Sequence, residues 1–244
     1  MDEVNPRIKR FRLIAGPNGS GKSTLVRWLS ESYRVNFYSI VNADDILAEV
    51  SRSGAYLPKF PVAKEDLAEY AEHSTYSEDV KAVFRGDGVS VSGDCVRFGK
   101  SAVNSYTIAL FANFLQDRFI DRGESFSQET VFSHPSKIEA LKRAQAAGYR
   151  TYLYFVSTAD NEINRFRVAN RYAQGGHSVP DDKIVSRYSR SIAQLKPALP
   201  YLNRAFVFDN SGTAMDYLGQ YESSSGWAFS RPSERLPQWF VEVI

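Results

Sequence analysis

Five short runs of apolar and β-branched residues recur along the chain, at 11–15, 36–41, 125–132, 149–156 and 204–208. Runs of this kind are typical of β-strands. Most of them are separated by stretches of helical length, at 23–32, 136–147, 159–173 and 181–195. Strands that alternate with helices predict a parallel sheet covered by helices on both faces. The chain is therefore predicted to be an α/β protein.

Residues 51–123 interrupt this alternation. They contain two candidate helices, at 62–84 and 102–121, on either side of a glycine-rich, strand-like stretch at 85–99. We interpret the segment as an insertion between the second and third strands of a single domain that spans residues 1–244. It either shapes the binding site of a phosphate acceptor or forms a packing subdomain, since long inserts at binding faces often carry function.

A phosphate-binding loop lies between the first predicted strand and the first predicted helix. It fits the pattern G-x-x-x-x-G-K-[ST] with Gly16, Pro17, Asn18, Gly19, Ser20, Gly21, Lys22, Ser23 and Thr24. The glycines let the backbone curl so that successive N–H groups point at phosphate oxygens. Lys22 adds positive charge at the β- and γ-phosphates, and the Ser23 hydroxyl can ligate Mg²⁺. The loop predicts a nucleoside triphosphate as ligand and leaves the reaction open.

Two carboxylates are expected at the carboxyl edge of the sheet, where parallel sheets bind their ligands. Asp44 follows the second predicted strand, and a kinase needs an aspartate that accepts the proton of the attacking hydroxyl. The same position also suits helix capping, for which Asn42 is the other candidate. Glu129 lies in the third strand region, where an acid is costly unless it faces the site. The alternative is an exposed glutamate on a sheet edge.

Arginines crowd the region around the Gly-Gly-His-Ser-Val-Pro stretch at 175–180, namely Arg165, Arg167, Arg171, Arg187 and Arg190. Arg167 and Arg171 are four residues apart and can share one helix face. Guanidinium groups neutralise phosphate oxygens bidentately, and the Gly-Gly pair would let them close on ATP. The alternative is a solvated basic helix face. We interpret His177 as a loop residue rather than a base.

Composition narrows the class of protein. The 30 basic and 28 acidic residues give no signal for a polyanionic partner, and Cys95, as the only cysteine, excludes an intramolecular disulfide. The sequence shows no signal peptide and no apolar run long enough to span a bilayer, which predicts a cytoplasmic protein. Nucleic acid is not expected as a partner, because the basic residues of the insertion are sparse and no aromatic–basic stripe accompanies Lys81, Arg85, Arg97 and Lys100.

Together these motifs resemble the zeta toxin family of P-loop kinases, and most closely the branch labelled predicted ABC-type ATPases. Besides the loop, the resemblance rests on residues 42–44, 125–133, 148–150, 167–168, 175–180, 187–188 and 208–211. It covers residues 11–45 and 124–211, about half of the chain. No Leu-Ser-Gly-Gly-Gln signature is present, which argues against a transporter-type motor.

The resemblance implies a nucleotide-kinase fold, with a central five-stranded parallel sheet in the order 2-3-1-4-5 and a mostly helical insertion. It also implies ATP-dependent phosphorylation of a hydroxyl on a small metabolite. The leading acceptor is a nucleotide sugar, UDP-N-acetylglucosamine, and the implied protein partner is an antitoxin. The rival interpretation is an ATP-binding switch that is not a kinase and acts through a protein partner.

The roles of single residues also follow from the resemblance. Lys22 and Ser23 match the positions that hold ATP and Mg²⁺, and Asp44 matches the catalytic base. Glu129, with Thr130 beside it, matches the acceptor-binding position, while the triphosphate is assigned to Arg167 and Arg171. The family's His-Pro pair does not follow Asp44, and residues 51–123 match the toxins poorly, so the acceptor remains open.

Overall fold

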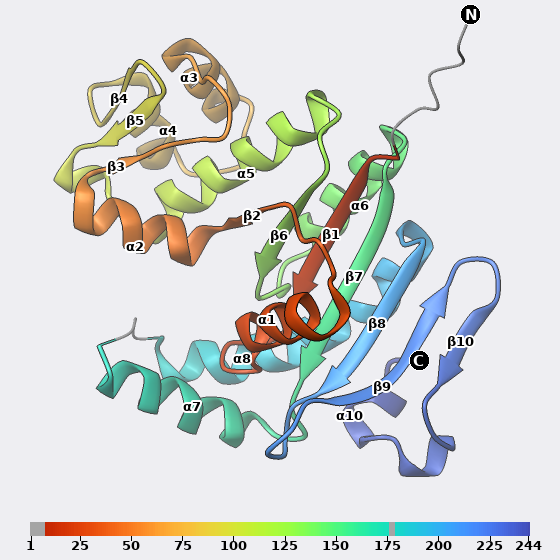
Figure 1. Ribbon diagram of the computed structural model, residues 1–244. Coiled ribbons are helices and arrows are strands. Elements are labelled where there is room, and N and C mark those ends of the chain that lie inside the picture. The colour runs from red at the N-terminus through yellow and green to blue at the C-terminus, as the bar shows by residue number, and fades with distance from the viewer. Residues whose placement is uncertain (1–7, 176–178) are drawn as a thin grey trace, which may run out of the picture. The chain divides into compact units, whose positions relative to one another are not determined.

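The computed structural model describes residues 8–175 and 179–244 (Figure 1). This part of the chain divides into two compact units. One unit is formed by the described residues up to Tyr38 together with Ser125–Ile244, and the other by Ser39–Glu124. The predicted insertion at 51–123 lies inside the second unit.

The first unit is built on a mostly parallel sheet. Its strands follow the order β10-β9-β8-β7-β1-β6. Their bounds are Arg10–Ala15 for β1, Phe126–Thr130 for β6, Arg150–Ser157 for β7, Arg204–Asp209 for β8, Asp216–Glu222 for β9 and Gly226–Phe229 for β10. The four central strands β6, β1, β7 and β8 pair in parallel with one another. This arrangement confirms the α/β fold with a central, mostly parallel sheet.

Two antiparallel strands extend the sheet beyond what the sequence predicted. β9 pairs antiparallel with β8, and β10 pairs antiparallel with β9. Both strands come from the tail after Ser211, where none of the five predicted strands lies. The pattern hides β9 because Gly219 and Gln220 interrupt its apolar alternation.

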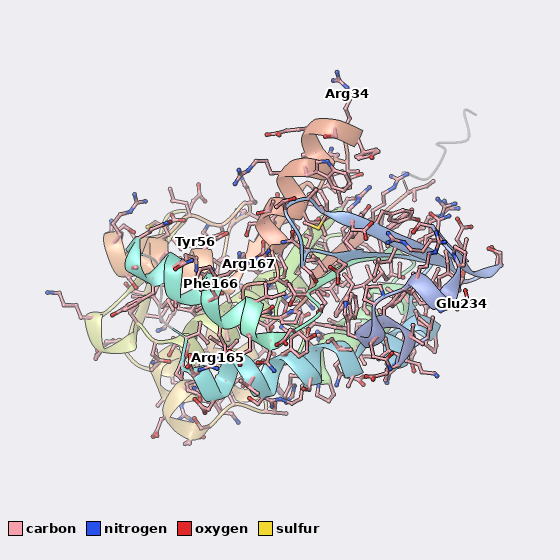
Figure 2. All side chains as sticks on the ribbon, turned by 90° about the horizontal axis from the view of Figure 1, so that it is seen from below. Arg34, Tyr56, Arg165, Phe166, Arg167 and Glu234 are labelled. Atoms are coloured by element: carbon pink, nitrogen blue, oxygen red, sulfur yellow. The ribbon has the colours of Figure 1, made fainter. Side chains whose placement is uncertain are left out.

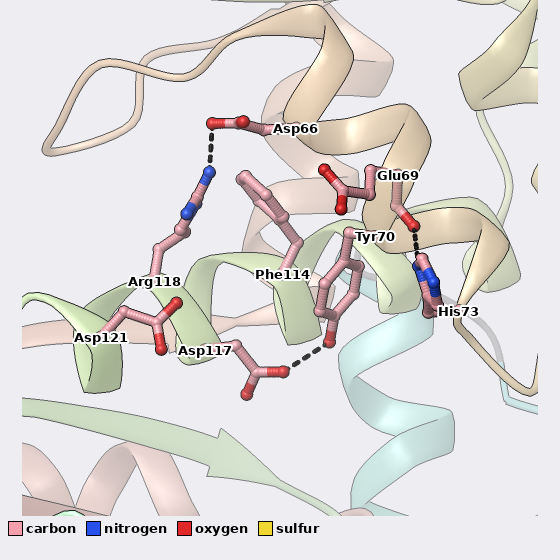
Figure 3. Close-up of a pocket in the computed structure, with 8 residues that line it drawn as sticks. All are labelled: Asp66, Glu69, Tyr70, His73, Phe114, Asp117, Arg118 and Asp121. Atoms are coloured by element: carbon pink, nitrogen blue, oxygen red, sulfur yellow. Dashed lines mark hydrogen bonds and ion pairs between the residues drawn. The ribbon is translucent and has the colours of Figure 1, made fainter.

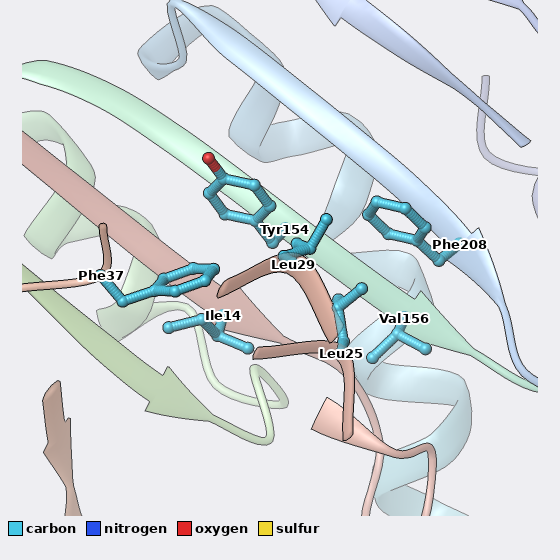
Figure 4. Close-up of a cluster of buried hydrophobic side chains, with 7 residues drawn as sticks. All are labelled: Ile14, Leu25, Leu29, Phe37, Tyr154, Val156 and Phe208. Carbon is cyan, nitrogen blue, oxygen red and sulfur yellow. The ribbon is translucent and has the colours of Figure 1, made fainter. Parts of the chain in front are cut away.

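Helix α1 (Lys22–Tyr33) packs on the sheet just beyond the phosphate-binding loop. Its buried residues Leu25 and Leu29 contact a cluster that includes Ile14 of β1 and Val156 of β7 (Figure 4). Full burial of one such side chain stabilises a fold by about 1.5–3 kcal/mol. The cluster therefore fixes the beginning of α1 at the carboxyl ends of the strands.

Other helices complete the first unit, with α1 on one face of the sheet and α6 and α8 on the other (Figure 1). Their bounds are Ser136–Ala146 for α6, Asn161–Ala173 for α7, Asp181–Ala193 for α8, Leu195–Ala198 for α9 and Gln238–Val241 for α10. Short 3₁₀ turns lie at Leu199–Tyr201 and Ser233–Arg235. The helices predicted from the sequence thus appear within a few residues of their expected bounds.

The tail is anchored to the sheet through a buried tryptophan. Trp239 of α10 packs against Phe155 of β7, with ring centroids 6.0 Å apart. Its indole Nε1 donates a hydrogen bond of 2.8 Å to the Asp209 carboxylate at the end of β8. Asp209 is itself buried, so its carboxylate depends on this donor and on the backbone N–H of Ser211 at 2.8 Å.

We expect Trp239→Phe to lower the free energy of unfolding by about 1–3 kcal/mol, because the buried carboxylate of Asp209 loses a donor. Chemical denaturation measures the change. Val241→Ala is the matched control, because Val241 lies on the same helix and is 40% exposed. Equal stabilities for the two variants would show that the hydrogen bond contributes nothing.

The second unit combines four helices and a small antiparallel sheet of order β3-β5-β4. Its helices are α2 (Ala43–Ser53), α3 (Lys64–Glu72), α4 (Glu78–Arg85) and α5 (Ser105–Asp121), with a 3₁₀ turn at Lys100–Ala102. Its strands are β2 (Ser39–Asn42), β3 (Ala55–Tyr56), β4 (Val89–Ser92) and β5 (Cys95–Phe98). The strand-like stretch predicted at 85–99 is thus a β4–β5 hairpin.

Two predicted boundaries in this region are wrong. The helix predicted over 62–84 is two helices, since α3 ends before His73 and α4 starts only after Ser77. The strand predicted from residue 36 begins at Ser39. Asn36 forms a turn instead, accepting a 2.8 Å hydrogen bond from the Tyr38 backbone N–H, and Tyr38 has a positive φ of 56°.

Candidate active site

The phosphate-binding loop joins β1 to α1 as the sequence predicted. Gly21 precedes α1 in a left-handed conformation, with φ of 96°, which glycine adopts without steric cost. The Lys22 ammonium donates hydrogen bonds to the backbone carbonyls of Gly16 at 3.0 Å and Pro17 at 3.1 Å. The lysine side chain therefore lies over its own loop rather than in the surrounding solvent.

A cavity of about 250 Å³ opens beside this loop. Three separate segments contribute to it, namely the loop, the end of β6 and one face of α7. The lining residues are Gly19, Gly21, Lys22, Ser23, Thr24, Glu129, Arg167, Val168 and Arg171. The cavity thus brings together the residues predicted to bind triphosphate, metal and acceptor in the first unit.

Glu129 faces the loop because of its position in the sheet. It lies beside Ile14 in the parallel register of β1 and β6, one residue before the end of each strand. Both carboxylate oxygens of Glu129 lie 3.4 Å from the Ser23 hydroxyl oxygen. That distance is long for an O–H···O hydrogen bond, so the contact is weak. A hydroxyl and a carboxylate are hard oxygen ligands of the kind that Mg²⁺ prefers.

Thr130 does not line this cavity. Its hydroxyl oxygen instead accepts a hydrogen bond of 3.2 Å from the backbone N–H of Phe132. Phe132 is fully buried and has a positive φ of 60°, so the Thr130 side chain supports a tight turn after β6. Sequence reasoning could not separate Thr130 from its neighbour Glu129 because both end the same strand.

Some arginines of α7 line the cavity, whereas another forms ion pairs outside it. Arg167 and Arg171 line the cavity, and the Nη1 atom of Arg167 is buried with no hydrogen-bond partner among the described residues. Arg165 lies on the side of α7 toward α8 (Figure 2), where it pairs with Asp181 at 2.6 Å and Glu162 at 2.8 Å. Hydrogen bonds to Asp181, and then to Glu162, raise the pKa of Arg165 above its ordinary value.

Arg190, on α8, is not among the arginines that line the cavity. It is exposed and donates to the Ser186 backbone carbonyl of its own helix at 3.1 Å. Gly176, His177 and Ser178, which carry the predicted hinge and the histidine, lie outside the described residues.

Asp44 belongs to the second unit, in the first turn of α2. The capping residue of this helix is Asn42, whose Oδ1 accepts a 3.0 Å hydrogen bond from the Asp44 backbone N–H. The alternative interpretation of Asp44 as the cap is therefore wrong, and its exposed carboxylate has no capping role. Partial burial, followed by the charge of Asp44, raises the pKa of the neighbouring Asp45 carboxyl above its usual value.

The second unit contains a cavity of its own, of about 300 Å³ (Figure 3). Its polar groups pair largely with one another: Tyr70 donates to Asp117 at 2.8 Å, and Arg118 forms an ion pair with Asp66. The lining residues are Asp66, Glu69, Tyr70, His73, Phe114, Asp117, Arg118 and Asp121. Four carboxylates and no phosphate-binding loop make this cavity unsuited to a triphosphate, although it is the larger of the two.

Two asparagines that the sequence analysis gave no role contact the loop directly. Asn164 of α7 donates to the Asn18 backbone carbonyl at 2.6 Å, and Asn210 donates to the Ser20 backbone carbonyl at 2.8 Å. Asn210 lies within the 208–211 motif, which could have indicated its position but not its partner. Nothing in the sequence around Asn164 distinguishes it from an ordinary helical asparagine.

The sheet, the loop and the basic face of α7 define a P-loop kinase fold. The family model of the zeta toxins matches residues 99–222, just over half of the chain, and the protein therefore belongs to the zeta toxin family. That match begins after the phosphate-binding loop, whereas the motif resemblance includes it. No match was found among curated proteins.

Solved structures support the same fold at low sequence identity. A chain of the AvrRxo1-ORF1:AvrRxo1-ORF2 complex, crystallised with ATP, is 13% identical with a TM-score of 0.55, and the alignment covers 91% of this protein and 61% of that chain. The PezAT chromosomal toxin–antitoxin system of Streptococcus pneumoniae gives 15% identity and a TM-score of 0.52, covering 98% and 79%. This protein therefore spans about three fifths of the AvrRxo1 complex chain.

The described residues contain no group of three or more histidine, cysteine, aspartate or glutamate side chains arranged to hold a metal ion. A P-loop needs no such group, because its Mg²⁺ takes few protein ligands. No helix in the described ranges combines the length and the apolar character that a bilayer crossing requires.

Proposed function

We propose that this protein transfers the γ-phosphate of ATP to a hydroxyl group of a small metabolite. The observation that carries the proposal is the convergence of Lys22, Arg167 and Arg171 on one cavity with the phosphate-binding loop. Three cations on one triphosphate suit phosphoryl transfer, in which catalysis is mainly positioning and stabilisation of charge on the transferring group.

Mg²⁺ is the metal that this site would hold. The Ser23 hydroxyl would ligate it, with the Glu129 carboxylate on the same side of the cavity, 3.4 Å from that hydroxyl. When bound, Mg²⁺ neutralises charge on the phosphate oxygens. In the same proposal Glu129 contributes to binding of the acceptor, and Asp44 accepts the proton of the attacking hydroxyl.

The proposed acceptor is a nucleotide sugar, with UDP-N-acetylglucosamine as the leading candidate. Membership of the zeta toxin family supports this choice. A protein partner of the antitoxin kind is also part of the proposal. It is supported by the two-component nature of both solved relatives, AvrRxo1-ORF1 with AvrRxo1-ORF2 and the PezAT toxin–antitoxin system.

Asp44→Asn separates a kinase from an ATP-binding switch. We expect acceptor phosphorylation to fall by about 10²-fold or more, the usual contribution of a general base, while ATP still binds. The thermal midpoint should not change, since Asn42 rather than Asp44 caps α2. The measurement is the rate of phosphate transfer to UDP-N-acetylglucosamine at saturating ATP.

Asp45→Asn provides the matched control for this experiment. It removes one carboxylate from the same helical turn and should retain the wild-type rate. Full activity of Asp44→Asn would remove Asp44 from catalysis and favour the switch. Equal losses in both variants would mean that the charge of the turn, and not the Asp44 carboxylate in particular, is required.

A further inference from the structure

A buried side chain of α7 is hydrogen-bonded to the phosphate-binding loop. Asn164 is fully buried, and its Nδ2 donates a hydrogen bond of 2.6 Å to the backbone carbonyl of Asn18. Its Oδ1 accepts from the Thr158 hydroxyl, which is also fully buried. Both ends of the amide are therefore engaged, and the orientation of the side chain is fixed.

The backbone of α7 also meets the loop at Asn164. Gly19 has a φ of 76°, and a Cβ placed on it would lie 2.7 Å from the Asn164 backbone oxygen. Such an approach leaves no room for any side chain at Gly19. Asn164 therefore contacts the loop both by its backbone and by its side chain.

Asn164 lies on the same face of α7 as the arginines of the cavity. Residues three and four positions apart are neighbours on a helix, and Arg167 follows Asn164 by three positions, with Arg171 four positions further. The nearer of these, Arg167, has its Nη1 atom buried without a partner among the described residues. The helix thus presents one residue that fixes its register and then two guanidinium groups.

The residues that precede Asn164 are themselves held by hydrogen bonds. The Thr158 backbone carbonyl accepts a hydrogen bond of 2.7 Å from the Tyr188 hydroxyl of α8. Burial raises the pKa of the Tyr188 hydroxyl to about 12. The start of α7 is capped by Asp160, whose carboxylate accepts from the Glu162 N–H at 2.7 Å.

We propose that Asn164 is a positioning residue that sets Arg167 against the triphosphate by locking the register of α7 on the phosphate-binding loop. The proposal rests on the proposed kinase function and deepens it. Asn164 needs no contact with ATP in this role. Displacement of a catalytic group by about 1 Å can cost about 10²-fold in rate, which is the range in which a loosened helix would act.

Asn210 offers an internal comparison, because it bonds to a different carbonyl of the same loop. Its Nδ2 donates to the Ser20 backbone carbonyl at 2.8 Å, and a Cβ on Gly21 would clash with that nitrogen. Asn210 follows β8 and belongs to no helix that carries an arginine of the cavity. It supports the loop alone, so its effect should be independent of Arg167.

The test is a pair of double-mutant cycles on the full chain, with labelled ATP and UDP-N-acetylglucosamine. We expect Asn164→Ala to lower kcat by about 10- to 100-fold. The dissociation constant for ATP, measured by calorimetry, should change less than about fivefold, since the arginine acts mainly in the transition state. In the Arg167→Ala background, the same substitution should cost less than about threefold.

The fold-changes in kcat caused by Asn210→Ala and by Arg167→Ala should instead multiply in the double variant, because the two residues act on different elements. Asn170→Asp, on the exposed side of α7, should leave kcat unchanged and controls for changes to the helix in general. If Asn164→Ala and Arg167→Ala multiply as well, Asn164 acts on the fold alone and the proposal is overturned. A wild-type protein that transfers no phosphate would instead overturn the proposed function itself.

A milder variant keeps the test decisive if Asn164→Ala does not fold. Thr158→Val preserves the shape of the side chain and removes the hydroxyl that donates to Asn164. It should lower kcat by about 3- to 10-fold and show the same dependence on Arg167, as neighbours in one network do. An unchanged kcat for Thr158→Val would contradict the proposed locking of the amide.

Discussion

Lys22→Ala is expected to reduce phosphate transfer by about 10³-fold or more and to weaken ATP binding strongly. The lysine is the cation of the loop at which phosphate charge is densest, and charged hydrogen bonds to phosphate are the strong ones. Loss of one preorganised donor at a transition state typically costs about 10²–10³-fold. Lys22 also donates to two carbonyls of its own loop, so its loss affects the loop as well as the charge.

Calorimetric titration with ATP measures the loss of ATP affinity in Lys22→Ala. A thermal melt measures separately any loss of stability in the loop. Arg27→Ala is the matched control, because Arg27 is an exposed cation on the same helix and does not line the cavity. We expect the control to bind ATP as the wild type does. Unchanged ATP affinity in Lys22→Ala would refute the assignment of residues 16–24 as the triphosphate site.

Arg167→Ala and Arg171→Ala are each expected to lower turnover by about 10²–10⁴-fold, as arginines that stabilise a transferring phosphoryl group do. Their guanidinium groups line the cavity beside the loop, and Arg171 is exposed, so folding should be nearly unaffected. Single-turnover transfer of labelled phosphate gives the rate, and circular dichroism monitors the fold.

Arg190→Ala is the matched control for the two arginines. It also removes a guanidinium group from this region, but from a side chain that bonds to its own helix. We expect wild-type turnover for this variant. Wild-type rates in both Arg167→Ala and Arg171→Ala would leave these residues as a solvated helix face and remove the main support for phosphoryl transfer.

The sequence predicted the central strands and the phosphate-binding loop because both rest on local chemistry. A buried parallel strand such as β7 needs an apolar run, and a loop that wraps phosphate needs glycines before Lys22. The strands β9 and β10 escaped prediction, since β9 is stabilised by pairing with β8 and β10 by pairing with β9 and by contacts with Phe240, rather than by their own pattern.

Some residues at the cavity could be predicted from the sequence, and others could not because their contacts form only in the folded chain. Helical spacing indicated that Arg167 and Arg171 share a face, and the structure places both at the cavity. Spacing could not reveal that Arg165 is held by Asp181, nor that Asn164 reaches the loop carbonyl of Asn18. Such contacts depend on how α7 and the loop meet in space, which no local pattern encodes.

Incubation of the protein with ATP labelled at the γ-phosphate, Mg²⁺ and UDP-N-acetylglucosamine, beside a bacterial metabolite extract, tests the kinase assignment most directly. We predict that the label appears in a hydroxyl-bearing small molecule, with the nucleotide sugar as the leading product, and that Lys22→Ala abolishes the transfer. Label that appears only as free phosphate, or that stays in ATP in both mixtures, would contradict the account.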